Sequence, residues 1–223
     1  LPDIESNLFN QFLDKFLDAD VIINCAASLK PKTKKDIFLN EKFPIILVNH
    51  LKNIKKKIFF IHISSINILV DERKDFYTLT KRNAEKFLEK ENVTIIKLPL
   101  IYEKNKNIIQ PTGSFKQVDD YLKFKFLPIY PMIFPGHIHY PAEVNKVSDF
   151  VEKIILNENR KPTIYNIAGD KKKTLWNLFE EMANQRNKKT LKINFNIFNR
   201  IAPKILKGYL SKNSSVLQQL III

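Results

Sequence analysis

The sequence predicts an α/β fold built on a doubly wound parallel sheet, and three observations support this prediction. Its 223 residues are 44% hydrophobic and 27% charged, which is the balance of a globular chain long enough to bury a core. Short apolar runs alternate with amphipathic stretches in the order strand, helix, strand, helix, strand. The apolar runs fall well short of the ~20 residues that span a bilayer, so no membrane segment is expected.

Three apolar runs, rich in β-branched residues, have the character of buried strands. They lie at residues 21–25, 58–63 and 93–98, and Pro99 ends the third. Each run is continuous rather than alternating, which is typical of parallel strands covered on both faces. Because Cys25 ends the first run, we expect its side chain to be a buried, chemically inert hydrophobe.

Amphipathic stretches at 36–53 and 75–90 predict the helices between these strands. Residues 103–142 hold five prolines and no sustained period, which predicts loops with one short helix at 118–124. Further along, we expect a helix at 144–156, a strand at 163–168, a helix at 174–185, and a strand with one or two helices within 191–220.

The charge and cysteine content limit the classes of function. The net charge is +14, but lysine outnumbers arginine 32 to 5 and forms no single stripe, so dedicated nucleic-acid binding is not expected. The excess is consistent both with attraction of phosphate-bearing ligands and with no function at all. A single cysteine excludes an internal disulfide and a multi-cysteine zinc site. No signal-peptide pattern opens the chain, which favours a cytoplasmic protein.

The residues with the clearest chemistry lie on consecutive elements. Ser64 and Ser65 stand at the carboxyl end of the second strand, where open α/β sheets place ligands. Tyr77 and Lys81 follow, four residues apart on one face of a helix. A nearby ammonium lowers the pKa of a phenol, which can then act as an acid or base near neutral pH. Each motif alone is also typical of a solvated helix face or a turn, but their order together indicates acid–base chemistry.

Residues 20–102 resemble the extended short-chain dehydrogenase/reductase family, in its NAD-dependent epimerase/dehydratase branch. Six features carry the resemblance: the strand ending in Ala26-Ala27, Asn40 in the following helix, the Ile63-Ser64-Ser65 strand end, the Tyr77/Lys81 pair, Glu85 after it, and Lys97-Leu98-Pro99-Leu100-Ile101-Tyr102. Segments within 127–147 and 165–170 are similar at lower specificity.

The resemblance implies roles for individual residues. The catalytic residues would be Ser65, Tyr77 and Lys81, with Tyr77 as acid/base. The cofactor, NAD or NADP, would be bound by Ala26, Ala27, Asn40, Tyr77, Lys81 and Pro99. No metal is implied, and His137 and His139 lack a third ligand in the sequence. The partners would be a nucleotide-sugar substrate and a second copy in a homodimer, with no nucleic acid and no membrane.

The same resemblance predicts how the chain is organised. Residues 1–102 would form a Rossmann-like dinucleotide-binding domain that is N-terminally incomplete, because no glycine lies in a G-x-x-G-x-x-G loop. Roughly fifty to sixty residues would precede it in the family. Residues 103–223 would form a small C-terminal substrate-binding cap of mixed α/β structure, with about 144–170 returning to the main sheet.

Two further departures from the family concern the substrate. Ile68-Leu69-Val70 stands where the family usually has Val-Tyr-Gly, and Lys97 replaces an arginine. The predicted function is an NAD(P)-dependent epimerase, dehydratase or reductase of a nucleotide-linked sugar. The alternative is a non-catalytic binding or structural protein on the same scaffold, which has lost the cofactor loop.

Overall fold

The computed structural model describes residues 7–29, 31–53, 57–71, 74–112, 115–123, 129–134, 140–170 and 174–194. The described residues form two compact units. Unit 1 lies within residues 1–98 and 153–167, and unit 2 lies within residues 99–152 and 168–223. In the part of the chain that is described, no helix has the length and apolar character to cross a membrane.

Unit 1 is built on a four-stranded parallel sheet in the order β1-β2-β3-β9. The strands are β1 (Val21–Asn24), β2 (Phe59–Ser65), β3 (Thr94–Leu98) and β9 (Ile164–Asn166). The predicted α/β fold with a parallel sheet is therefore confirmed. β1 and β9 are the outer strands of this sheet, and one side chain of β1, Ile23, is 41% exposed although continuous burial was predicted.

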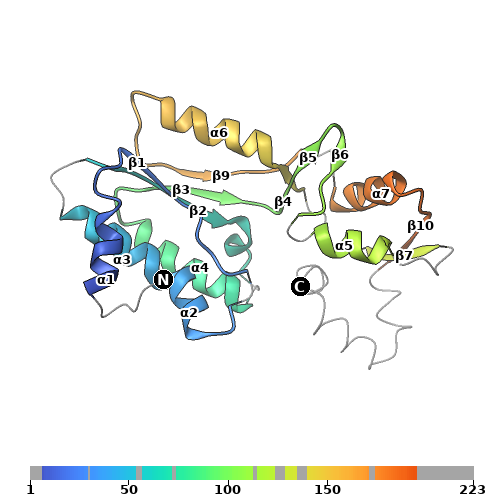
Figure 1. The fold of residues 1–223 in the computed structure, drawn as a ribbon, viewed down its shortest axis with the longest axis horizontal. Coiled ribbons are helices and arrows are strands. Elements are labelled where there is room, and N and C mark those ends of the chain that lie inside the picture. The colour runs from blue at the N-terminus through green and yellow to red at the C-terminus, as the bar shows by residue number, and fades with distance from the viewer. Residues whose placement is uncertain are drawn as a thin grey trace. The chain divides into compact units, whose positions relative to one another are not determined.

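Helices of unit 1 cover one face of the sheet, as Figure 1 shows for α3 and α4. The helical elements are α1 (Asn7–Asp14), α2 (Lys34–Ile37), the π-helix η1 (Phe38–Lys42), α3 (Phe43–Lys52), the 3₁₀ helix η2 (Ile66–Leu69) and α4 (Phe76–Leu88). Thr33 and Asp36 form a capping box at the start of α2, and the Asp75 carboxylate caps α4. The helix predicted at 36–53 is thus interrupted by a π-helical turn.

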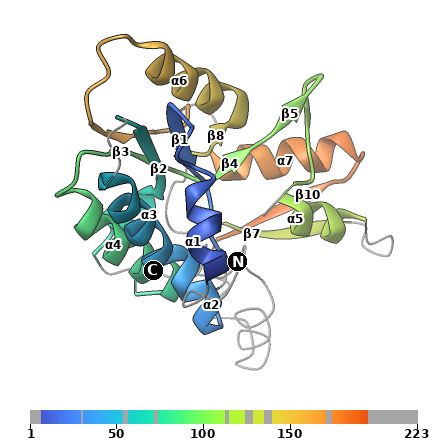
Figure 2. The ribbon, with the colours of Figure 1, turned by 60° about the vertical axis from the view of Figure 1, so that its left-hand side comes forward.

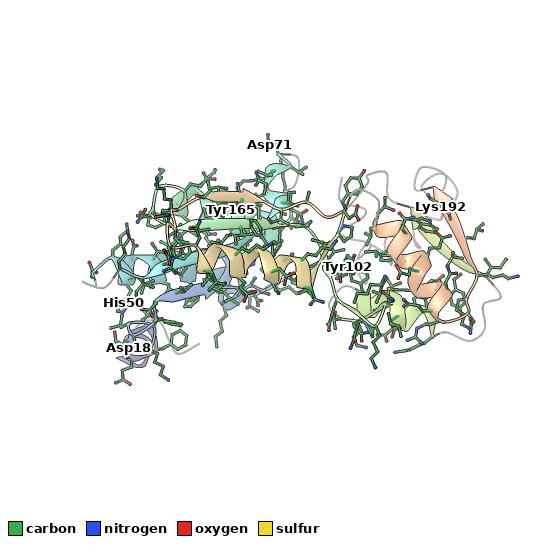
Figure 3. All side chains as sticks on the ribbon, turned by 90° about the horizontal axis from the view of Figure 1, so that it is seen from above. Asp18, His50, Asp71, Tyr102, Tyr165 and Lys192 are labelled. Carbon is green, nitrogen blue, oxygen red and sulfur yellow. The ribbon has the colours of Figure 1, made fainter. Side chains whose placement is uncertain are left out.

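One hydrophobic core joins these helices to the sheet. Its buried residues come from α1, α3 and α4 on the helical side and from the strands and the Val93 turn on the other: Leu13, Ile22, Phe43, Leu47, Val48, Phe60, Leu88, Val93 and Ile95. The apolar side chains that the sequence places on one side of these helices are therefore the ones that pack against the sheet. His50, on α3, is labelled in Figure 3 and pairs with Asp14 at the end of α1, with 3.2 Å between Nε2 and Oδ1.

The described part of unit 2 contains three helices and three two-stranded ladders. Figure 2 shows α5, α7 and the strands β7 and β10. The helices are α5 (Phe115–Leu122), α6 (Val144–Leu156, whose last turn belongs to unit 1) and α7 (Leu175–Gln185). The paired strands are β4 (Ile101–Tyr102) with β8 (Ala142–Glu143), β5 (Lys104–Asn105) with β6 (Ile108–Ile109), and β7 (Tyr130–Phe134) with β10 (Thr190–Asn194).

A second hydrophobic core holds unit 2 together. Its buried residues include Tyr102, Phe115, Leu122, Leu178 and Trp176. Lys192 lies over the Trp176 ring, with 5.2 Å from Nζ to the ring centroid, and Figure 3 labels it on β10. This tryptophan is a buried core residue.

Two sequence predictions are wrong in the described residues. The region 103–142 is not loop with one helix, because it contains β5, β6, β7 and the first residue of β8. Ladders of two residues have no periodicity that a sequence can show. Cys25 is exposed and follows the end of β1, so it is not a buried core residue. The terminal helices predicted within 191–220 lie outside the described residues.

Candidate active site

The carboxyl end of β2 presents two serines with different surroundings. Successive strand residues point to opposite faces. The Ser64 hydroxyl donates to Oε2 of Glu85 on α4 at 2.6 Å. The Ser65 hydroxyl oxygen accepts the backbone N–H of Asn67 at 3.3 Å and caps η2. The hydroxyl proton of Ser65 has no acceptor among the described residues.

Tyr77 and Lys81 lie on α4, one turn apart on one face as their spacing predicts. The Tyr77 side chain is half-buried, and the Lys81 side chain is only 2% exposed. Lys81 Nζ donates to the backbone carbonyl of Ile63 in β2 at 3.1 Å. This bond places the ammonium beside the strand that carries both serines.

The Lys81 side chain has a low pKa for a lysine. Burial lowers its pKa from 10.5 to about 8, although the Cys25 thiol and the Glu85 carboxylate act in the opposite direction. Burial, assisted by the charge of Lys81, also holds the pKa of His62 well below its ordinary value. His62 is therefore neutral, and Lys81 changes charge close to physiological pH.

The loop after β1 is shaped by Asn24 and His62. Asn24 Nδ2 lies 3.1 Å from His62 Nδ1, and because an amide nitrogen only donates, the ring nitrogen accepts. Asn24 Oδ1 in turn accepts the backbone N–H of Ala26 at 3.2 Å. The neutral imidazole in β2 thus fixes the first residue of the predicted cofactor loop, Ala26-Ala27.

Asn40 joins the same loop to α4 from within the π-helix. Its side chain accepts the Ser28 N–H at 2.7 Å and donates to the Ser28 carbonyl at 2.9 Å. Its Nδ2 also lies 3.2 Å from Thr80 Oγ1, one residue before Lys81. Asn40 is fully buried, and these hydrogen bonds connect the loop after β1 to α4.

Within unit 1, hydrogen bonds connect Asn40 to Thr80, the residue before Lys81, and connect Lys81 to Ile63, two residues before Ser65. Pro99 directly follows β3 and is the first residue of unit 2. The part played by His62 was not predicted from the sequence. A single polar residue within the apolar run 58–63 was the signal that could have revealed it.

No metal site is found within the described ranges, which hold no group of three or more His, Cys, Asp or Glu side chains suited to a metal. His137 and His139 lie outside the described residues.

Sequence comparison alone identifies no relative, because no family model and no curated protein matches the chain. Solved structures do match. UDP-glucuronic acid 4-epimerase from Bacillus cereus, in complex with NAD, is 18% identical with a TM-score of 0.62, over 86% of this chain and 69% of that one. The chain has the fold of nucleotide-sugar epimerases and reductases.

Two further structures support this assignment. The dTDP-4-dehydrorhamnose reductase of Bacillus anthracis, in complex with NADP, is 14% identical with a TM-score of 0.61, over 83% of this chain and 69% of that one. WbmG of Bordetella bronchiseptica, in complex with NAD and UDP, is 13% identical with a TM-score of 0.61, over 85% and 65%. The resemblance to the extended short-chain dehydrogenase/reductase family is confirmed at the level of the fold.

Proposed function

We propose that the protein is an NAD(P)-dependent epimerase, dehydratase or reductase of a nucleotide-linked sugar, with Ser65, Tyr77 and Lys81 at its catalytic centre. The observation that carries this proposal is the buried Lys81 ammonium, one helical turn from a half-buried phenol and bonded to the serine-bearing strand. An ammonium that titrates near neutral pH is costly to bury, and such groups are concentrated at functional sites.

The residues present fit the nicotinamide half of a dinucleotide. Lys81 carries three N–H donors, and the described residues give it one acceptor, the Ile63 carbonyl, which leaves donors for the hydroxyls of a ribose. Ala26 and Ala27, held by Asn24 and Asn40, would offer loop backbone to the cofactor. Tyr77 completes the proposed cofactor contacts of unit 1. When bound, the nicotinamide supplies the acceptor or donor of hydride.

The protein side of the chemistry is proton transfer by Tyr77. The phenolate of Tyr77 would take the proton of a sugar hydroxyl during oxidation and return it to the ketone oxygen during reduction. The positive charge of Lys81 favours that phenolate. Ser65, whose hydroxyl proton finds no acceptor among the described residues, would donate to the same sugar oxygen and orient it.

The substrate class comes from the similar structures, whose names include sugars linked to UDP and dTDP. An excess of positive charge would raise the local concentration of such diphosphates. The choice between NAD and NADP stays open in this proposal. A homodimer is also proposed from the resemblance, and light scattering of the purified protein would test it.

The decisive experiment is substitution of Tyr77 by phenylalanine. The change removes one hydroxyl and leaves the ring, so we expect Tyr77→Phe to lower turnover of a nucleotide sugar at least a hundredfold while the protein stays folded. Conversion of UDP-glucose, UDP-glucuronic acid and dTDP-glucose in the presence of NAD or NADP is followed by chromatography of the nucleotide sugars, because epimerisation and dehydration return the hydride and leave nicotinamide absorbance unchanged. Turnover within a few fold of the unaltered protein would contradict the assignment of Tyr77.

A second candidate function is a non-catalytic binding or structural role. It is motivated by the four glycines of the chain, none of which lies in a G-x-x-G-x-x-G segment that could cradle a pyrophosphate. In that case calorimetry would detect no affinity for NAD or NADP, and Lys81→Met would change nothing but stability. Micromolar affinity that Lys81→Met abolishes would exclude this second candidate.

A further inference from the structure

A buried charge pair lies one helical turn along α4 from Lys81. Glu85 is 2% exposed, and its two carboxylate oxygens have different partners. Oε2 accepts the Ser64 hydroxyl at 2.6 Å, and Oε1 forms an ion pair with Nζ of Lys97, which is 5% exposed. The proposed chemistry uses none of these three side chains.

The two partners of Glu85 are neighbours on the sheet. Ser64 of β2 and Lys97 of β3 are paired in register, so their side chains extend from adjacent strands to the same face. Lys81 bonds to the carbonyl of Ile63, the residue before Ser64. Successive turns of α4 are therefore attached to consecutive residues of β2. Lys97 Nζ also lies 3.7 Å from Oε1 of Glu89, one turn further along.

Stability alone gives little reason for charges at this place. The cost of removing a carboxylate and an ammonium from water largely cancels their attraction, and apolar residues of similar volume usually hold two elements together as well. What the charged group adds is direction. A carboxylate that must meet two donors on two strands restricts both the rotation and the axial position of its helix, whereas apolar contacts are non-directional.

We propose that Glu85, held by Ser64 and Lys97, is a positioning residue that fixes α4 on the sheet and thereby places Tyr77 and Lys81. The inference rests on the function proposed above for those two residues. Glu85 acts through them and contacts neither substrate nor cofactor. A displacement of about 1 Å is enough to reduce an acid–base step strongly, so an anchor one turn away matters for turnover.

The charge of Glu85 has a second consequence for Lys81. The titratable groups beside the ammonium are Glu85 and Tyr77 on the same helix, Cys25 after β1 and neutral His62 in β2. Glu85 raises the pKa of Lys81, in opposition to burial. Removal of the carboxylate therefore lowers the pKa of Lys81 further, and the loss of activity at alkaline pH begins at a lower pH.

The test uses the double variant Glu85→Gln/Lys97→Met, which removes both charges and therefore leaves no unpaired charge in the interior. We expect kcat to fall about ten- to hundredfold. KM for the nucleotide sugar should change less than about twofold, because the sugar site is untouched. Amides of α4 should exchange with solvent faster while those of α3 do not. The pH profile is measured on Glu85→Gln, which removes the carboxylate alone, and its alkaline limb should move to lower pH. The matched control, Lys97→Arg, keeps the ion pair and should have the kcat of the unaltered protein.

The outcomes separate this inference from the proposed function. A double variant with unchanged kcat and α4 exchange overturns the positioning role. If instead Tyr77→Phe keeps full turnover, the proposed function fails, and the exchange of α4 amides still decides whether Glu85 anchors the helix. Should the double variant not fold, Ser64→Ala removes one of the two holds on Glu85, and unchanged α4 exchange in that variant likewise overturns the inference.

Discussion

Lys81 illustrates at the scale of a residue how much stability a functional group can cost. Its pKa falls from 10.5 to about 8 on folding, which corresponds to about 3 kcal/mol at neutral pH. Because the folded pKa is the lower one, the unfolded chain binds the proton more tightly. This contribution to stability therefore rises with pH between about 8 and 10.5, and its full cost is present below pH 8.

His62 makes a testable contribution to the pH dependence of stability. Its pKa is well below 6.5 in the folded protein, so the unfolded chain gains the proton first as the pH falls below 6.5. We expect the free energy of unfolding to drop by about 1 kcal/mol between pH 6.5 and 5.5 for this reason. In His62→Gln, which can still accept from Asn24, this part of the drop should vanish. Urea midpoints at pH 7.0 and 5.5 measure it.

Equal slopes for the unaltered protein and His62→Gln would show that the buried imidazole does not control this range of pH.

At the scale of elements, a second carboxylate connects α5 to the end of α7. Asp119 is buried, and its oxygens bind Lys123, with 2.7 Å between Oδ2 and Nζ, and the Arg186 guanidinium, with 2.6 Å between Oδ1 and Nε. Burial raises the pKa of Asp119, but the hydrogen bonds from Lys123 and Arg186 outweigh it and hold the pKa below its ordinary value. The ionised Asp119 carboxylate, bound by Lys123 and Arg186, thus stabilises unit 2 at pH values above those at which it gains a proton.

We expect Asp119→Asn to lower the free energy of unfolding by about 2 kcal/mol, because two charge-assisted hydrogen bonds are lost at once. The matched control is Asp120→Asn on the same helix. Asp120 is exposed and pairs only with surface lysines among the described residues, so its loss should leave the urea midpoint close to that of the unaltered protein. Fluorescence of Trp176, the only tryptophan in the sequence, reports the transition in urea. Equal effects of the two variants would contradict the buried role of Asp119.

Long amphipathic elements could be predicted from the sequence, and contacts between elements could not. The helix predicted at 75–90 is α4, and its spacing alone placed Tyr77 and Lys81 on one face. The ion pair of Glu85 and Lys97 was invisible, because its partners are distant in the sequence and meet only once α4 packs on β3. The π-helical turn was also missed, since it follows from packing rather than from the residues' own preferences.

At the scale of the whole molecule, the chain leaves unit 1 for unit 2 after Leu98, returns after Glu152 and leaves again after Ile167. Gly169 stands just beyond the last of these passages. Its N–H donates to the Tyr140 carbonyl at 3.2 Å, and a Cβ at this position would lie 2.0 Å from the Pro141 carbonyl oxygen. Only glycine allows this backbone approach.

We therefore expect Gly169→Ala to destabilise the protein by about 1–3 kcal/mol, because the obstacle is backbone that cannot rotate away. Thermal unfolding followed by circular dichroism measures the loss. Ala168→Ser, at the exposed neighbouring position, is the control and should change stability by less than about 0.5 kcal/mol. A melting temperature for Gly169→Ala equal to that of the control would show that the two segments separate at no cost.

The place of β9 in the sheet has a consequence for synthesis on the ribosome. β9 pairs with β3, yet residues 99–163 must be translated between them. At about 5–20 residues per second, the outer edge of β3 waits several seconds for its partner. During that interval the nascent chain presents an apolar, unpaired strand edge, the feature that templates aggregation. Chaperones that bind extended apolar segments would therefore meet this protein while it is still attached to the ribosome, and slower translation of residues 99–163 should lower its yield.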